Sequence, residues 1–296
     1  MKIAISGSGG LIGTALVPLL RADGHEVLRL VRGPAGTGEA CWDPQGGAVD
    51  TAALEGCDAV VHLAGESIAA GRWNAARKAR IRDSRVRGTS VLAAALAGLA
   101  RRPQALLCAS AIGYYGDRAA LLLDESAAPG SGFLAEVCRE WEAAADAART
   151  AGIRTVHGRL GMVLSAEGGA LRKMLAPFRL GLGGAMGGGA QYWSWISLPD
   201  AAAALRFLLR SELGGPVNLT APNPVPQREF ARALGRALGR PAFVPMPAFA
   251  ARLALGEMAD ALMLSSARVV PRRLLDAGFR FRHPELAPAL PELLGA

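Results

Sequence analysis

Three evenly spaced glycines near the start of the chain leave few folds open to it. The segment Gly7–Gly13 reads Gly-Ser-Gly-Gly-Leu-Ile-Gly, a G-x-x-G-x-x-G pattern. The β-rich run Lys2–Ser6 precedes it, and Leu11–Ala22 follows with the apolar spacing of a helix that ends at Asp23-Gly24. A glycine-rich turn between a strand and a helix is typical of the first unit of a nucleotide-binding α/β sheet.

Each glycine in this pattern has a physical role. The first permits a tight turn, the second lets a pyrophosphate approach the backbone, and the third lets helix and strand pack closely. The start of the helix adds free N–H groups and a positive dipole end, both of which favour an anion. We therefore predict a dinucleotide cofactor whose pyrophosphate is bound by Gly7, Gly10, Leu11, Ile12 and Gly13.

The alternation of strands and helices continues along the first half of the chain. β-Rich or apolar runs are separated by helical patterns, which predicts a parallel sheet with right-handed crossovers. The fold class is thus α/β, a doubly wound parallel (Rossmann) sheet. The expected strands are Lys2–Ser6, Glu26–Val31, Ala59–Ala64, Gln104–Ala109 and one within Ile153–Leu164, and the expected helices are Leu11–Ala22, Asn74–Leu99 and Leu134–Ala151.

After residue 165 the pattern changes. Glycines cluster between 181 and 189, and prolines punctuate residues 241–247. We predict a Rossmann domain over residues 1–165 and a smaller C-terminal α+β region over 166–296, on the substrate side. Residues 191–220 are expected to return in part to the first domain.

The end of the second strand selects between cofactors. An acidic residue there accepts hydrogen bonds from the ribose hydroxyls of NAD, whereas an arginine accommodates the extra phosphate of NADP. This chain has Arg29-Leu-Val-Arg32 and no acid. Because a guanidinium matches a phosphate well, Arg32 predicts a preference for NADP(H) over NAD(H).

Composition excludes several classes of protein. Net charge is +8, but the charges are spread along the chain and only 5% of residues are aromatic, so no nucleic-acid partner is expected. No apolar run reaches the length of a membrane span, and no membrane partner is expected. The four cysteines and four histidines form no ligand pattern, so no metal site is expected. A cytoplasmic monomer or homodimer that acts on an unidentified small molecule is the resulting expectation.

Beyond the glycine loop, the chain resembles the extended short-chain dehydrogenase/reductase superfamily. Within it, the chain is similar to the atypical branch of NAD-dependent epimerase/dehydratase-like "epimerase family" proteins, which carry their own C-terminal domain of unknown function. The motifs that carry this resemblance are Gly7–Gly13, His62-Leu-Ala-Gly-Glu66, Arg72-Trp-Asn74, Ser110-Ala-Ile-Gly-Tyr-Tyr-Gly116, Phe133–Glu142 and Pro177–Gly184.

The resemblance implies further cofactor contacts. Leu63, Ala64 and Gly65 would lie along the adenosine ribose and the pyrophosphate. Arg85 on the long helix would make a further contact with the cofactor. Ser110 would lie beside the nicotinamide, with Met162 near the nicotinamide ribose or amide. All of these follow predicted strands except Arg85, as expected for ligands at the carboxyl ends of parallel strands.

The superfamily's catalytic Tyr-x-x-x-Lys pair is absent. Aligned on Glu142, its two positions carry Leu134 and Cys138. The remaining candidates for catalysis are Ser110 and Tyr114, although a phenol without a neighbouring cation is a weak base at neutral pH. Two functions stay open: an NADP(H)-dependent oxidoreductase or epimerase-like enzyme with a non-standard active site, and a catalytically inactive NADPH-binding sensor or regulatory protein.

Overall fold

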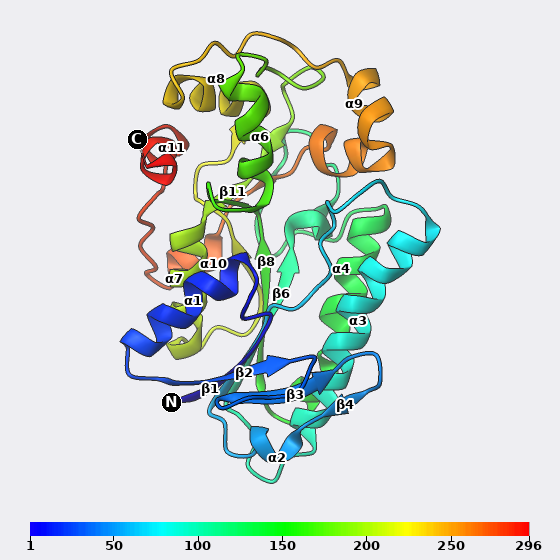
Figure 1. The fold of residues 1–296 in the computed structure, drawn as a ribbon, viewed down its shortest axis with the longest axis vertical. Helices are drawn as coiled ribbons and strands as arrows, with labels where there is room; N and C mark the ends of the chain where they lie inside the picture. The colour runs from blue at the N-terminus through cyan, green and yellow to red at the C-terminus, as the bar shows by residue number, and fades with distance from the viewer. Residues whose placement is uncertain (296) are drawn as a thin grey trace.

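The computed structural model describes residues 1–295, which are built around an eight-stranded sheet (Figure 1). The strand order is β12-β8-β6-β5-β1-β2-β3-β4, and every pair is parallel except the edge pair β3–β4. This confirms the doubly wound α/β fold. The strands are β1 (Lys2–Ser6), β2 (Glu26–Val31), β3 (Glu39–Asp43), β4 (Ala48–Val49), β5 (Ala59–His62), β6 (Ala105–Ala111), β8 (Arg154–Leu160) and β12 (Gly215–Leu219).

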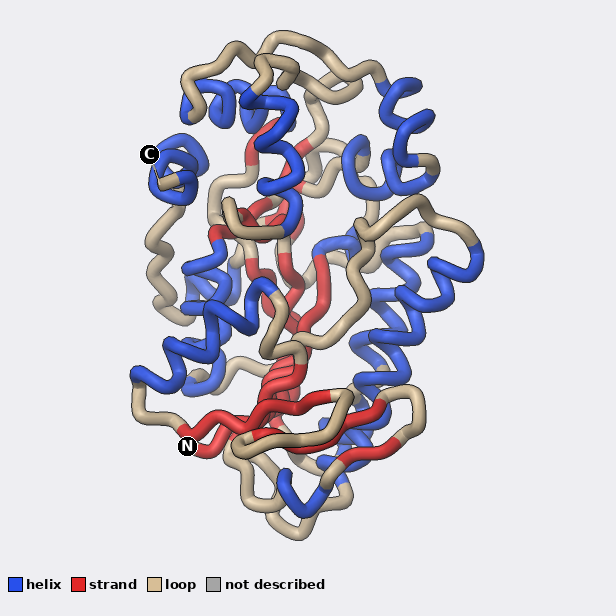
Figure 2. The backbone as a smooth tube through the Cα atoms, in the orientation of Figure 1, coloured by secondary structure: helices blue, strands red, loops and turns tan. Residues whose placement is uncertain are grey.

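Helices cover both faces of this sheet, as Figure 2 shows. Side chains alternate across a strand, so Ile3 and Ile5 of β1 pack on one face with α1 and α7 while Ala4 packs on the other with α3 and α5. Both faces are therefore buried. The helices of this part are α1 (Leu11–Ala22), α2 (Thr51–Leu54), α3 (Ala75–Ala97), the 3-10 helix η1 (Ile112–Tyr115), α4 (Phe133–Ala143), α5 (Asp146–Thr150) and α7 (Leu198–Arg210).

A third core cluster joins the helices at the other end of the molecule. It is centred on Trp193, Trp195 and Phe230. The elements of this end are α6 (Gly169–Arg179), α8 (Gln227–Ala237), α9 (Ala248–Leu255), the π-helix η2 (Ala259–Leu264) and α11 (Leu286–Leu294). The short strand pairs are β7 (Leu122–Leu123) and β14 (Arg268–Val269), β9 (Met162–Leu164) and β11 (Trp195–Ser197), and β10 (Tyr192–Trp193) and β13 (Val225–Pro226). Helix α10 (Arg272–Asp276) packs instead on the central sheet, where Leu274 joins the core with α1 and α7.

The chain crosses between these two parts more than once. Strand β12 pairs with β8, so residues 215–219 complete the central sheet. Asp200 at the start of α7 then accepts the backbone N–H groups of Arg282 and His283, at 2.8 and 2.9 Å, and this ties the C-terminal segment to the sheet. The boundary at residue 165 stays a prediction.

Two expected elements are divided in the structure. The predicted helix Leu134–Ala151 is broken after Ala143 into α4 and α5, because a 3-10-type bond from Ala145 N–H to the Glu142 carbonyl tightens the turn there and Ala145 is buried. The predicted strand region Ile153–Leu164 is β8 and β9, separated at Gly161. The strands β3 and β4 were missed by the sequence analysis.

A buried histidine ends β5 beneath the glycine loop. His62 is fully buried, its Nδ1 lies 2.6 Å from the Ser6 hydroxyl, and its ring meets the edge of Trp42. Burial lowers the pKa of His62 to about 4. His62 therefore belongs to the core as a neutral side chain and takes no part in proton transfer.

This burial predicts an acid-sensitive fold. The unfolded state takes up a proton near pH 6.5 and the folded state only near pH 4, so the contribution of His62 to stability is complete above pH 6.5 and is lost as the pH falls towards 4. Between pH 7 and pH 5 the free energy of unfolding should drop by about 2 kcal/mol from this residue. Urea titrations of the wild type and of His62→Gln measure it. Burial also lowers the pKa of His157, but this residue is present in both proteins and its effect cancels in the comparison. Equal pH dependence in the two proteins would therefore contradict the assignment to His62.

Candidate functional site

The glycine loop runs against the end of β5 with no space for side chains. Gly7 has a φ of +72°, and a Cβ added to it would lie 2.7 Å from the carbonyl carbon of Leu63. A Cβ on Gly13 would lie 2.6 Å from the Cα of Ser8. Both positions therefore require glycine, one for its backbone angle and both for close backbone approach.

The first helix begins without a cap. Gly10 is its N-cap and is exposed, it offers no side-chain hydrogen bond, and the first turn holds no acidic residue. The earliest helical bond runs from Thr14 N–H to the Gly10 carbonyl at 2.9 Å. The N–H groups of Leu11, Ile12 and Gly13 thus have no carbonyl partner within the helix. An uncapped, partly exposed helix start with free donors fits a pyrophosphate.

Two arginines stand at the carboxyl end of β2, and one of them contacts this loop. Arg32, just after the strand, is exposed and makes no ion pair or side-chain hydrogen bond with any residue in 1–295. Arg29 donates from Nε to the Ser8 hydroxyl at 3.0 Å and pairs with Glu39 at 3.3 Å. The sequence analysis missed the contact between Arg29 and Ser8. Only the β1–β2 register, which places Ile5 beside Arg29, brings the two together.

The loop after β5 rests on a half-buried arginine. Arg85 of α3 donates to the Glu66 carbonyl at 3.0 Å and lies over the ring of Trp141. A Cβ added to Gly65 would be 3.5 Å from its Cζ atom. Burial lowers the pKa of Arg85 from its ordinary value. The structure therefore brings Arg85 to the Leu63–Gly65 segment, as a support beneath the backbone. A direct contact between Arg85 and the cofactor stays a prediction.

Ser110 lies at the carboxyl end of β6 and is 2% exposed. Its hydroxyl donates to Glu142 of α4 at 2.7 Å. The same carboxylate accepts two hydrogen bonds from Arg159 of β8, both at 2.8 Å. Burial disfavours the charge of Arg159, yet the hydrogen bonds to Glu142 prevail and raise its pKa. Ser110 is thus the end of a buried charged network.

Two tyrosines of η1 lie on this network. Tyr115 is fully buried, accepts from Arg159 at 3.0 Å and donates to Asn218 at 2.7 Å, and burial raises its pKa. Tyr114 is only half-buried, and its ring centroid lies 3.4 Å from the Arg159 Cζ atom. The Tyr114 hydroxyl makes no hydrogen bond with any described residue. It is therefore free to meet another molecule.

Leu134 and Cys138, the positions that the family resemblance assigns to the Tyr-x-x-x-Lys pair, face the same turn. A Cβ on Gly113 would lie 3.2 Å from Leu134 Cβ and 3.8 Å from the Cys138 sulfur. The Cys138 thiol is 3.6 Å from the Ala111 carbonyl, and burial raises its pKa to about 12. The thiol is therefore protonated and uncharged at neutral pH, and the Leu134 side chain has no proton to exchange.

Met162 follows β8 at the same edge of the sheet. Its N–H donates to the Ser194 carbonyl at 2.9 Å, and its side chain is half-buried. Trp193 and Trp195 are 6% and 0% exposed and belong to the core. The carboxyl edge of the sheet therefore gathers the glycine loop, Leu63–Gly65, Ser110, Tyr114 and Met162.

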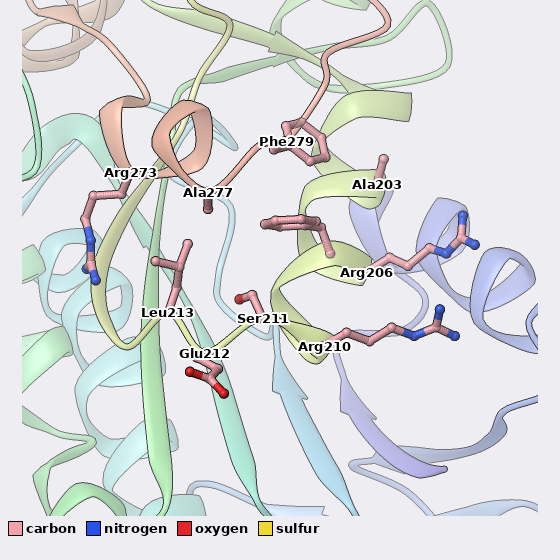
Figure 3. A pocket seen from close by; sticks show the side chains of 10 residues that line it. Ala203, Arg206, Arg210, Ser211, Glu212, Leu213, Arg273, Ala277 and Phe279 are labelled. Atoms are coloured by element: carbon pink, nitrogen blue, oxygen red, sulfur yellow. The ribbon is translucent and has the colours of Figure 1, made fainter.

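A cavity of about 770 Å³ lies elsewhere, at the amino end of β12 between α7 and α10 (Figure 3). Its arginines Arg206 and Arg210 point away from it towards α1, where both pair with Asp23. None of the predicted site residues lines it. Within residues 1–295 there is also no group of three metal-ligating side chains, and no helix is long and apolar enough to span a membrane.

Comparison with known proteins agrees with this arrangement. The model of the NAD dependent epimerase/dehydratase family matches residues 3–219, and a domain of unknown function (DUF1731) matches residues 246–293. Epimerase family protein MT2273 of Mycobacterium tuberculosis is 48% identical over 292 residues, which cover 97% of this chain and 96% of the relative. Epimerase family protein SDR39U1 of Homo sapiens is 38% identical over 300 residues, 99% of this chain and 100% of the relative.

A solved structure extends the likeness to three dimensions. The crystal structure of human epimerase family protein SDR39U1 (isoform2) with NADPH matches this model with a TM-score of 0.90 at 37% identity, over 100% of this chain and 99% of that one. The resemblance inferred from the motifs is confirmed, and the chain belongs to the NAD dependent epimerase/dehydratase family.

Proposed function

We propose that this chain is an NADP(H)-dependent oxidoreductase or epimerase-like enzyme in which Tyr114 replaces the usual proton-transfer group. The cofactor, when bound, supplies or accepts a hydride. Support for its binding comes from the uncapped start of α1 and from the human relative, whose structure was determined with NADPH.

The residues that would hold the cofactor follow the carboxyl edge of the sheet. Gly7, Gly10 and the N–H groups of Leu11–Gly13 would bind the pyrophosphate, and Leu63–Gly65 would lie along the adenosine side. Arg32, exposed and without a partner among the described residues, would bind the 2′-phosphate. Ser110 and Met162 would border the nicotinamide.

The observation that carries the catalytic proposal is the stacking of Tyr114 on Arg159. Tyr114 would hand its phenol proton to a carbonyl oxygen of the substrate, or take one from a carbinol. Negative charge builds on the phenol oxygen as the proton leaves. A guanidinium fixed 3.4 Å from the ring centroid stabilises that charge without having to move. Ser110 acts through Glu142, which holds Arg159 in place.

A second candidate function is cofactor binding without turnover. It is favoured by Leu134 and by the Cys138 thiol, whose pKa of about 12 leaves no charged or proton-transferring group where the superfamily has both. The chain would then report the state of the NADPH pool to a partner. Turnover assays separate the two functions.

Reversing the charge of Arg32 should change cofactor preference. Losing charge-assisted bonds to the 2′-phosphate costs about 1.5–3 kcal/mol, so Arg32→Glu should weaken NADPH binding about 10- to 100-fold and leave NADH binding nearly unchanged. Titration followed by nicotinamide fluorescence measures both constants. Arg21→Glu, an exposed arginine in the last turn of α1, is the matched control. Unaltered discrimination between the two cofactors would refute the role of Arg32.

Removing only the phenol oxygen of Tyr114 tests the chemistry. Tyr114→Phe keeps the ring over Arg159, so the NADPH Kd should not change, while kcat on a reducible carbonyl substrate should fall about 10²- to 10⁴-fold. The control is Tyr192→Phe, which alters another tyrosine beside an arginine, Arg268. A panel of carbonyl compounds and nucleotide sugars, followed by NADPH absorbance, supplies the substrate. Full activity in Tyr114→Phe would exclude this residue. Tight NADPH binding with no turnover across the panel would favour the second function.

A further inference from the structure

Large apolar side chains are exposed at the end of the molecule remote from the N-terminal strands. They come from the loop after α6 and from the segment that runs over this end from α8 into α9 (Figure 1). We call this set the apolar crest. Its members and their exposed fractions are Leu180 (74%), Leu182 (60%), Phe243 (77%), Phe249 (72%) and Leu253 (76%).

Backbone contacts make the crest one surface. Val244 N–H donates to the Gly183 carbonyl at 3.1 Å, and Met246 N–H donates to the Ala185 carbonyl at 2.8 Å, so the two segments lie side by side. Phe249 and Leu253 are one helical turn apart on α9, and therefore share a face. Contiguous apolar surface of this kind marks an interaction site.

A row of arginines adjoins the crest. Arg228, Arg232 and Arg236 recur every four residues on the solvent side of α8, and Arg240 follows the helix. All four are exposed, and none makes an ion pair or a side-chain hydrogen bond with another described residue. From residue 227 to 255 the chain has five arginines and a single carboxylate, Glu229. The row meets the crest where Gly235 of α8 packs on Ala242, next to Phe243.

We propose that the apolar crest and the arginine row together dock this protein on the surface of an anionic lipid bilayer. Exposed apolar side chains insert at the boundary of headgroups and acyl chains, while neighbouring arginines bind anionic headgroups. The contact is peripheral, because no helix of the described chain could span the bilayer. This revises the expectation of no membrane partner, which rested on the absence of a spanning segment.

Charge argues against a second copy as the occupant. A two-fold interface buries the same patch of both subunits, so it would gather two arginine rows in one contact, where Glu229 of each copy is the only carboxylate from residues 227–255. A bilayer instead offers a continuous negative surface. The crest also projects from a loop and a helix, and the cavity between α7 and α10 includes none of its residues. A bilayer can accept protruding side chains without a pocket of complementary shape.

Co-sedimentation with lipid vesicles tests the proposal on the full chain. Vesicles of equal parts phosphatidylcholine and phosphatidylglycerol should bind the protein at about 0.15 M salt, whereas pure phosphatidylcholine should not. Arg232→Glu/Arg236→Glu should weaken binding more than about tenfold. Phe243→Ser/Phe249→Ser should weaken it comparably at low and at high salt, because these side chains contribute apolar contact. Melting temperatures confirm that each variant is folded.

The matched control is Arg21→Glu/Arg280→Glu, two exposed arginines outside this surface that give the same change in net charge. It should bind vesicles nearly as well as the wild type. Three outcomes would overturn the proposal: no binding to anionic vesicles, an equal loss in the control, which would indicate net charge alone, and a concentration-dependent dimer abolished by Phe243→Ser/Phe249→Ser without vesicle binding. Binding of DNA or RNA, in place of vesicles, that requires Arg232 and Arg236 would also overturn it.

Discussion

The charge of Arg159 sets the arrangement of the whole carboxyl edge of the sheet. Its side chain is 3% exposed, and a buried charge without a partner would cost about 3–5 kcal/mol. Glu142 offsets that cost with two hydrogen bonds at 2.8 Å, which obliges α4 to pack where its carboxylate reaches β8. Ser110 donates to the same carboxylate, and Tyr115 accepts a further hydrogen bond from Arg159. The planar guanidinium of Arg159, fixed in this way, lies against the ring of Tyr114.

This network shows what sequence can and cannot predict. The glycine loop was predictable because its signal is local: three glycines, a strand before and a helix after. The position of Ser110 and Tyr114 at this edge of the sheet was also predictable, because the carboxyl ends of parallel strands lie at the same edge. The hydrogen bond from Ser110 to Glu142 could not be predicted, because the two residues are 32 positions apart and meet only through the packing of α4 on β6. The sequence analysis noted that a phenol needs a cation, but Arg159 had no local signal to identify it.

The C-terminal half illustrates the same limit at the level of the fold. A shift to glycine and proline after residue 165 indicated a different region, but which later strand rejoins the sheet depends on pairing across the chain. Asp200 contributes to this long-range arrangement, because it accepts hydrogen bonds from the Ser197 hydroxyl and from the backbone N–H groups of residues 282 and 283. These hydrogen bonds to the buried Asp200 carboxylate anchor the segment that leads into α11.

In the proposed mechanism, and on the correspondence that the family resemblance implies, the positive charge comes from a position other than the helix lysine of the superfamily's Tyr-x-x-x-Lys pair. Here the helix position is Cys138, and the cation is an arginine on β8, within the core. A lysine can lose its proton and move on a flexible stem, whereas a guanidinium remains charged and is held here by a bidentate carboxylate. The position of the positive charge beside Tyr114 is therefore set by packing. Glu142 of α4 holds the Arg159 guanidinium in place. Any chemistry at Tyr114 therefore depends on how α4 packs on the sheet.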